Sequence, residues 1–219
     1  MRRRVAIGVA CVVLAVVVGV CVWRVNANAL TFPVREYDLQ EDVALDGAFA
    51  EYAYENTEGY SLRVTGARRM SVDEYFGLYG QDEQGETTYR ENAPREVGSP
   101  DAALIVLDIE IRNDKAADDD KGYLDSIGWA LQSEQKPEYW IRVESGVFNC
   151  SIPQVEGSYK LSIKPGTTFT LHVPFRAPSV PSDFPAPAGT FEAPPLEAGA
   201  YSFVITKAPV RNVVKFDVT

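Results

Sequence analysis

The sequence holds little of the chemistry on which most enzymes and metalloproteins depend. It contains one histidine, His172, and three cysteines, of which Cys11 and Cys21 lie within an apolar N-terminal run. A single histidine excludes a histidine-rich metal site and leaves one candidate base for a catalytic triad. Cys150 is alone after that run, so the rest of the chain forms no intrachain disulfide and needs a hydrophobic core. We therefore predict no catalytic residues and no bound cofactor.

Basic residues are scarce beyond the N-terminus. The chain has 21 Lys and Arg and 31 Asp and Glu, and four of its arginines but none of its acids precede residue 30. The remainder is therefore strongly acidic. This balance argues against partners such as nucleic acid and anionic lipid surfaces, since both require cationic patches. A solvated acidic surface is the simplest interpretation, and an attraction for cations or basic partners is the alternative.

The N-terminal run is the most informative feature that the sequence does have. Three arginines at residues 2–4 precede a stretch from Val5 to Val22 without a charge or an amide. Its length approaches the roughly 20 residues that span a bilayer, and Trp23 and Arg24 end it as interfacial residues do. We predict a cytoplasmic start at 1–4, a transmembrane helix or signal anchor at 5–23, a stalk at 24–46 and an extracytoplasmic domain at 47–219.

Cleavage of this run is the alternative. Ala27-Asn28-Ala29 offers the small residues of a signal-peptidase site, and cleavage after Ala29 would make the protein secreted. The apolar stretch is longer than the apolar region of a usual signal peptide, which has roughly 7–15 residues. This length favours a single-pass anchor in the cell membrane. Lipidation at Cys21 is disfavoured, because Val20 stands where a small residue is needed.

Residues 47–219 have the alternation typical of β-strands. In 103–112, for example, Ile105, Leu107, Ile109 and Ile111 share one face. A capping box at 71–74 predicts one short helix over 74–79, followed by a long connection over 81–100. Lys164-Pro165-Gly166 is expected to join a hairpin whose second arm places His172 on its outer face. Strands are expected at 60–68, 103–112, 127–132, 139–144, 158–163, 167–175, 200–206 and 210–218, after an extended segment at 48–54.

Two of these motifs carry a family resemblance. The strand ending in Ile109-Glu110-Ile111-Arg112-Asn113-Asp114, and Lys164-Pro165-Gly166 leading into the strand that ends at Phe175, form one ordered pattern. It resembles the immunoglobulin-like, telokin-like domains of unknown function in membrane-anchored exported proteins of Gram-positive bacteria. The resemblance covers about residues 60–219. It implies a mainly β fold, namely an immunoglobulin-like antiparallel β-sandwich of about seven to eight strands with one short helix, and it brings no catalytic residues.

An acidic loop is the candidate metal site. Asp114, Asp118, Asp119 and Asp120 supply the oxygen ligands that Ca²⁺ prefers. The spacing is not that of an EF-hand, because Gly122 stands at the fifth position from Asp118 rather than the sixth. Solvated carboxylates are the alternative interpretation.

The candidate binding surface is aromatic. Tyr52, Tyr54, Tyr75 and Tyr79 precede the main strands, and exposed tyrosines stack on sugars or anchor protein partners. Ordinary half-burial in strands is the alternative.

Three hypotheses about function follow. We expect a non-enzymatic binding or interaction module at the membrane, with a protein or glycan partner in the envelope. The first alternative is a structural or assembly accessory of an envelope or transporter complex. The second is a sortase-like transpeptidase using Cys150, His172 and Arg176. The cysteine precedes the histidine, however, which reverses the sortase order, and no Thr-Leu-x-Thr-Cys stretch surrounds it.

Overall fold

The computed structural model describes residues 17–20, 32–92, 103–116, 120–137, 140–152, 159–176 and 196–219. The chain divides into two compact units, Met1–Phe32 and Pro33–Thr219. In the first unit residues 17–20 are helical, and the rest of the predicted transmembrane segment lies outside the described residues. Over the described ranges, no helix is both long enough and apolar enough to cross a membrane.

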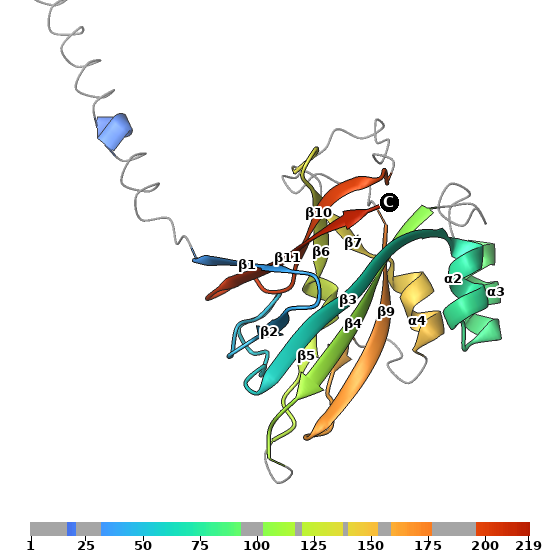
Figure 1. The fold of residues 1–219 in the computed structure, drawn as a ribbon, viewed down its shortest axis with the longest axis horizontal. Helices are drawn as coiled ribbons and strands as arrows, with labels where there is room; N and C mark the ends of the chain where they lie inside the picture. The colour runs from blue at the N-terminus through green and yellow to red at the C-terminus, as the bar shows by residue number, and fades with distance from the viewer. Residues whose placement is uncertain are drawn as a thin grey trace, which may run out of the picture. The chain divides into compact units, whose positions relative to one another are not determined.

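The second unit is mainly β, as predicted, and is built on one nine-stranded sheet (Figure 1). Neighbouring strands are antiparallel except for β1 and β11, which are parallel. The expected antiparallel sandwich of two facing sheets is therefore replaced by a single mixed sheet. Its spatial order is β1 (Val34–Asp38), β11 (Arg211–Val218), β10 (Gly199–Val204), β6 (Ala130–Ser133), β7 (Ile141–Val143), β9 (Thr167–Arg176), β4 (Ala103–Asn113), β3 (Tyr60–Ser71) and β2 (Asp42–Ala44); β5 (Leu124–Asp125) and β8 (Lys160–Leu161) form a separate pair.

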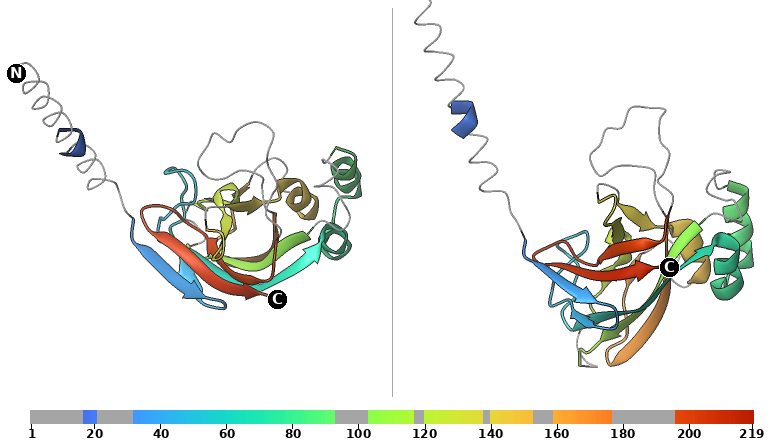
Figure 2. Two further views of the ribbon diagram at one scale, coloured as in Figure 1. Left: turned by 90° about the horizontal axis from the view of Figure 1, so that it is seen from above. Right: turned by 45° about the horizontal axis from the view of Figure 1, so that its top comes forward.

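The sheet curls until its two edges approach each other. β1 and β2 are the edge strands, yet only residues 39–41 separate them in the chain, so their adjoining ends lie within about 14 Å. The amide of Gln40 in this link donates to the carbonyl of Val64 in β3 at 2.9 Å. Figure 2 shows the resulting curvature. The concave side encloses the main core, in which Trp129 packs edge-on against Phe203 with ring centroids 5.6 Å apart.

A second, smaller core covers the convex side of β3 and β4. Ile105, Leu107, Ile109 and Ile111 fill the main core, as the alternation predicts, but Leu104 and Val106 on the opposite face are also fully buried. Helices α2 (Val72–Tyr79) and α4 (Ser145–Ser151) bury them. This cluster contains Met70, Val72, Tyr75, Phe76, Leu104, Val106, Val147 and Cys150.

The structure contains more helix than expected. The capping box is confirmed, because Ser71 Oγ accepts from the Glu74 amide at 3.1 Å while Glu74 Oε2 accepts from the Ser71 amide at 2.7 Å. The predicted connection over 81–100, however, contains α3 (Glu83–Asn92), and α4 was also not expected. Helix α3 buries none of its residues and therefore needs no apolar stripe. Because such a stripe is the sequence signal of a helix, α3 could not be recognised from the sequence.

Three other predictions need correction. The stalk prediction is wrong for the residues of β1 and β2, which pair within the sheet, so the domain begins before residue 47. Residues 48–54 form turns, with an isolated bridge from Phe49 to Ala208, rather than an extended strand. The predicted hairpin does not form, because β8 pairs with β5 while β9 pairs with β4 and β7.

The end of β4 explains the failed hairpin. The side-chain amide of Asn113 donates to the carbonyl of Ile163 at 2.7 Å, and the Gly166 amide donates to the Asn113 carbonyl at 2.7 Å. Gly166 has φ of +72°, which favours glycine at this turn. The turn therefore passes the end of β4 and delivers β9 onto β4, in register from Thr167 opposite Asn113 to Phe175 opposite Ile105.

Candidate binding site at the free edge of β9

Among the described residues, β9 is paired along one side only for most of its length. β4 lies along its entire inner side, whereas β7 meets the other side only where Val143 faces Phe175 and Arg142 faces Arg176. In the part of the chain that the structure describes, no strand pairs with residues 167–173 on that side. Within the described structure, a free strand edge thus runs along the first half of β9.

Two hydrogen bonds show which backbone groups point out of this edge. The His172 carbonyl accepts from the Tyr75 hydroxyl at 2.6 Å, and the Pro174 carbonyl accepts from the Glu144 amide at 2.8 Å. Neither donor belongs to β4. Because alternate residues of an antiparallel strand direct their backbone groups to the same side, the amide and carbonyl of Thr170 and the amide of His172 also point away from β4. Proline at 174 fits this arrangement, since its missing N–H faces the edge.

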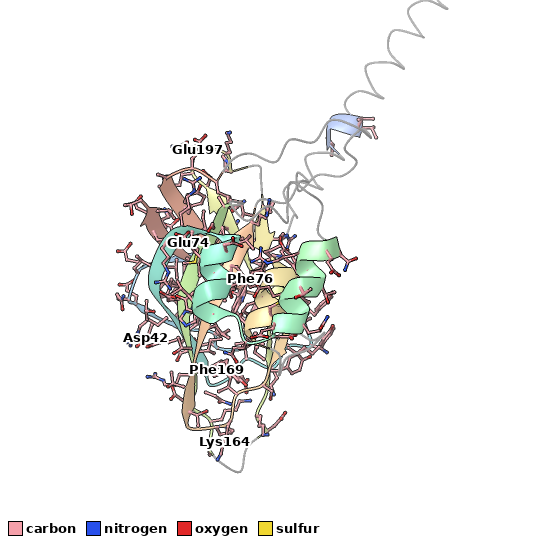
Figure 3. All side chains as sticks on the ribbon, turned by 90° about the vertical axis from the view of Figure 1, so that its right-hand side faces the viewer. Asp42, Glu74, Phe76, Lys164, Phe169 and Glu197 are labelled. Carbon is pink, nitrogen blue, oxygen red and sulfur yellow. The ribbon has the colours of Figure 1, made fainter. Side chains whose placement is uncertain are left out.

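A groove of about 380 Å³ follows this edge. One wall is the end of α2, a second is the end of α4, and β9 forms the third. Two of the lining side chains are apolar and exposed, Leu78 at 65% and Phe169 at 41%. Figure 3, which looks onto α2 and α3, shows Phe169 below α2. The lining residues are Leu78, Tyr79, Gly80, Gln81, Phe148, Ser151, Ile152, Phe169, Thr170, Leu171 and His172.

A polar network fixes the side chains on the convex wall of the groove. His172 Nδ1 lies 2.6 Å from Asp108 Oδ1, which also accepts from Arg68 Nη2 at 3.0 Å. The Tyr79 ring stacks on the His172 ring, with centroids 4.0 Å apart and planes 16° apart, and the Tyr79 hydroxyl accepts from Arg68. The prediction that His172 lies on the outer face is confirmed. The network holds Tyr79 and His172 in one orientation beside the free edge.

Tyr75 and Ser151 join the floor of the groove to this network. Tyr75 is fully buried, and its hydroxyl lies 2.8 Å from Ser151 Oγ as well as bonding the His172 carbonyl. Ser151 Oγ donates to the Phe148 carbonyl at 2.8 Å. Burial raises the pKa of Tyr75 well above its usual value. Tyr75 is therefore a neutral donor that fastens α2 and α4 to β9.

The four tyrosines of the predicted binding surface fall into two groups. Tyr52 and Tyr54 are exposed and stack with ring centroids 5.0 Å apart and planes 9° apart. Tyr123 lies beside Tyr54, and the ammonium group of Lys160 lies over the rings of Tyr54 and Tyr123. Tyr79 lines the groove instead. Tyr75 does not contribute to a surface, because its side chain is buried on the inner face of α2.

Cys150 has the surroundings of a structural thiol. It is 3% exposed, its Sγ donates to the Gly146 carbonyl at 3.2 Å, and burial raises its pKa to about 11. None of the contacts among the described residues joins Cys150 to His172, whose Nδ1 is occupied by Asp108. Arg176 stands at the opposite end of β9 from the turn, opposite Arg142.

The acidic loop is only partly described. Asp118 and Asp119 lie outside the described residues. Asp114 accepts from Arg112 Nε at 2.9 Å, and Asp120 accepts from Asn56 Nδ2 at 3.2 Å and from the Gly122 amide at 3.3 Å. Within the described ranges no three His, Cys, Asp or Glu side chains are grouped so that they could hold a metal ion.

Sequence reasoning missed most of the groove. Asp108 and Arg68 come from β4 and β3, and nothing in the sequence pairs them with His172. Pro174, which marks the outward side of β9, is the one local signal that was available.

Fold and groove together define a mainly β domain with an unpaired strand edge beside a helix-walled groove. Residues 34–212, from β1 to β11, match the model of the family described as Domain of unknown function (DUF5028), and the chain belongs to that family. A search of curated proteins found no match, and neither did a search of solved structures.

Proposed function

We propose that the chain is a membrane-anchored, extracytoplasmic binding module that captures an extended segment of a partner protein along the free edge of β9. The carrying observation is the row of outward-pointing backbone groups on Thr170 and His172 beside the groove. Strand addition of this kind takes affinity from main-chain hydrogen bonds and specificity from pockets for alternate side chains.

The shape of the site favours an extended peptide over a compact ligand. The free edge from residue 167 to residue 173 is about 20–24 Å long at the usual rise of a strand. The side chains of Phe169 and Leu171 lie on one face of β9, and those of Thr170 and His172 lie on the other. A strand added there would place alternate side chains against each face, and the exposed Leu78 and Phe169 favour apolar ones.

The composition of the edge also supports the proposal. Proteins usually protect exposed strand edges with lysine, proline or inward charges, because open edges pair with other chains. Residues 167–171 are Thr-Thr-Phe-Thr-Leu, which carry no charge, and the first proline follows only at 174. An unprotected edge next to a groove is what capture of a strand requires.

The test uses the full chain in nonionic detergent micelles. The probe is a fluorescent, end-blocked heptapeptide that alternates valine and threonine, and fluorescence anisotropy measures its binding. Thr170→Pro removes one outward amide and should weaken binding at least tenfold. Thr170→Val keeps the backbone donor and serves as the matched control. Circular dichroism confirms that both variants are folded.

A second pair of peptides tests the hydrogen-bonding mode. N-methylation of the alternate amides that face β9 should abolish binding, whereas methylation of the other set should leave it within about twofold. Equal binding of both methylated peptides, or of Thr170→Pro and the unaltered chain, would show that strand addition does not occur.

A glycan is the second candidate partner, because Tyr52 and Tyr54 are exposed and their rings stack with nearly parallel planes. Aromatic platforms of this type bind sugar faces. Tyr54→Ala should then reduce retention of the chain on immobilised cell-wall polysaccharide while leaving heptapeptide binding unchanged. Retention that is equal for Tyr54→Ala and the unaltered chain counts against this candidate.

Anchoring is proposed from the apolar run that follows the N-terminal arginines. Intact-mass measurement of the protein from its native membrane tests it directly. An unprocessed N-terminus supports the anchor, and a chain that begins after Ala29 supports secretion. The immunoglobulin-like relationship is likewise a proposal, which rests on the sequence motifs at residues 109–114 and 164–175.

A further inference from the structure

Three basic side chains surround one tryptophan on a different part of the domain. The charged groups of Arg211, Lys207 and Arg142 lie 5.5, 5.6 and 5.9 Å from the centroid of the Trp140 ring. Any two of these groups are therefore less than about 12 Å apart, which is comparable with a Debye length at moderate salt. Such a cluster stands out in a chain with a formal net charge of −10.

The positive charge of this cluster is mostly unbalanced. Lys207 pairs with Glu51 at 3.1 Å, but Arg211 Nη2 donates to the neutral Gln132 side chain at 2.6 Å. Arg142 is exposed and makes no ion pair in the described part of the chain. The Nε atom of Arg211 is buried without a hydrogen-bond partner in the same described part. Among the described residues, the ion pair of Lys207 with Glu51 is the only one that these three cations form.

The backbone holds these residues in place from several directions. Trp140 and Arg142 are at the start of β7, Lys207 follows β10, and Arg211 begins β11. The Lys207 amide donates to the Phe49 carbonyl at 2.8 Å, and the Arg211 amide donates to the Pro33 carbonyl at 2.9 Å. The cations are therefore positioned by the fold and not by a single flexible loop.

We infer that Trp140, Arg142, Lys207 and Arg211 form a binding site for a phosphate-bearing ligand. The exposed Arg142 guanidinium offers forked donors that match phosphate oxygens, and Arg211 and Lys207 add positive charge beside it. The Trp140 ring holds the three cations together through cation–π contacts, because each charged group lies within about 6 Å of its centroid. This site is independent of the free edge of β9, since none of its four residues lines that groove.

Binding of inorganic pyrophosphate to the full chain in nonionic detergent tests this inference. Isothermal titration calorimetry at low ionic strength should show saturable binding that weakens as salt is added. Arg142→Gln should weaken pyrophosphate binding about tenfold. Trp140→Phe should retain the phosphate contacts, but it should lose the change in tryptophan fluorescence that we expect when pyrophosphate binds to the unaltered chain. Lys215→Gln removes a cation that pairs with Glu36 four residues further along β11 from Arg211, and it is the matched control.

The outcomes are distinct. Weakening by Arg142→Gln but not by Lys215→Gln supports the site. Binding that does not saturate, or that both variants weaken equally, would overturn it in favour of diffuse attraction. Competition by detergent micelles that contain phosphatidylglycerol, but not by those with phosphatidylcholine, assigns the phosphate to a lipid headgroup. Saturable binding of pyrophosphate without such competition assigns it to a soluble ligand.

Discussion

The hydroxyl of Tyr75 donates a hydrogen bond of 2.6 Å to the backbone carbonyl of His172. This contact joins α2 to the outward side of β9 and satisfies one acceptor of the free edge. The His172 amide and both backbone groups of Thr170 point away from β4 on the same side. Because Ser151 Oγ also lies 2.8 Å from the same hydroxyl, one buried oxygen ties α2, α4 and β9 together.

Removal of that oxygen should loosen the groove. Tyr75→Phe leaves the part-buried His172 carbonyl without this donor, which should lower the free energy of unfolding by about 1–3 kcal/mol. Urea unfolding followed by circular dichroism measures the change. Tyr52→Phe alters an exposed ring and should stay within about 0.5 kcal/mol of the unaltered chain. Equal effects of the two substitutions would contradict the role given to Tyr75.

Asn113 is expected to be the most sensitive polar residue at the end of β4. It is fully buried, and its side-chain amide donates to the carbonyls of Lys121 at 2.9 Å and Ile163 at 2.7 Å while its oxygen accepts from the Lys115 amide at 3.1 Å. Asn113→Ala leaves the Ile163 carbonyl and the Lys115 amide without these partners, whereas the Lys121 carbonyl still accepts from the Tyr60 hydroxyl. The substitution should cost about 2–4 kcal/mol in urea unfolding. Asn92→Ala on exposed α3 is the control, and a loss for Asn113→Ala as small as for this control would refute the prediction.

Strand positions could be predicted because the main core is lined by one face of each strand. In β4, alternate isoleucine and leucine side chains are all buried, so the period of two was visible. The capping box at Ser71 was equally local. The pairing of the strands was not predictable in the same way. The turn at residues 164–166 is held by Asn113, which lies far away in the sequence, and this contact directs β9 to β4 instead of β8.

The candidate site was mostly hidden for the same reason. Tyr79 and His172 were both singled out, but their stacking depends on how α2 crosses β9. Asp108 becomes a partner of His172 only through the register of β4 with β9. The free edge exists because β7 pairs with only the last two residues of β9. The number of residues over which two strands pair depends on both strands, so the sequence of one strand does not predict it.

Cys150 should behave as a buried, unreactive thiol. Burial raises its pKa to about 11, so the thiolate that reacts with iodoacetamide is scarce at pH 8. We expect alkylation of the folded chain at this position to be at least about tenfold slower than in 6 M guanidinium chloride. Peptide mass spectrometry separates Cys150 from the other two cysteines. Rapid labelling at pH 8 in the folded state would instead return Cys150 to consideration as a nucleophile.

Glu144 should make the stability of the domain depend on pH. Its pKa is raised above the ordinary value of 4.5, chiefly by burial, although Arg176 and the Gly146 amide act in the opposite direction. Between 4.5 and this raised pKa the folded state binds more protons than the unfolded state. The free energy of unfolding therefore falls as pH rises through that window, and the penalty is fully present above it.

Glu144→Gln removes the ionisation but keeps an oxygen that can accept from the Gly146 amide. The variant should match the unaltered chain below pH 4.5 and become more stable than it as pH rises towards neutrality. Urea unfolding at a series of pH values measures this difference. Glu58→Gln changes an exposed glutamate and should show no such trend. If Glu144→Gln were instead less stable at pH 7, the attraction between Glu144 and Arg176 would outweigh the cost of burying the carboxylate.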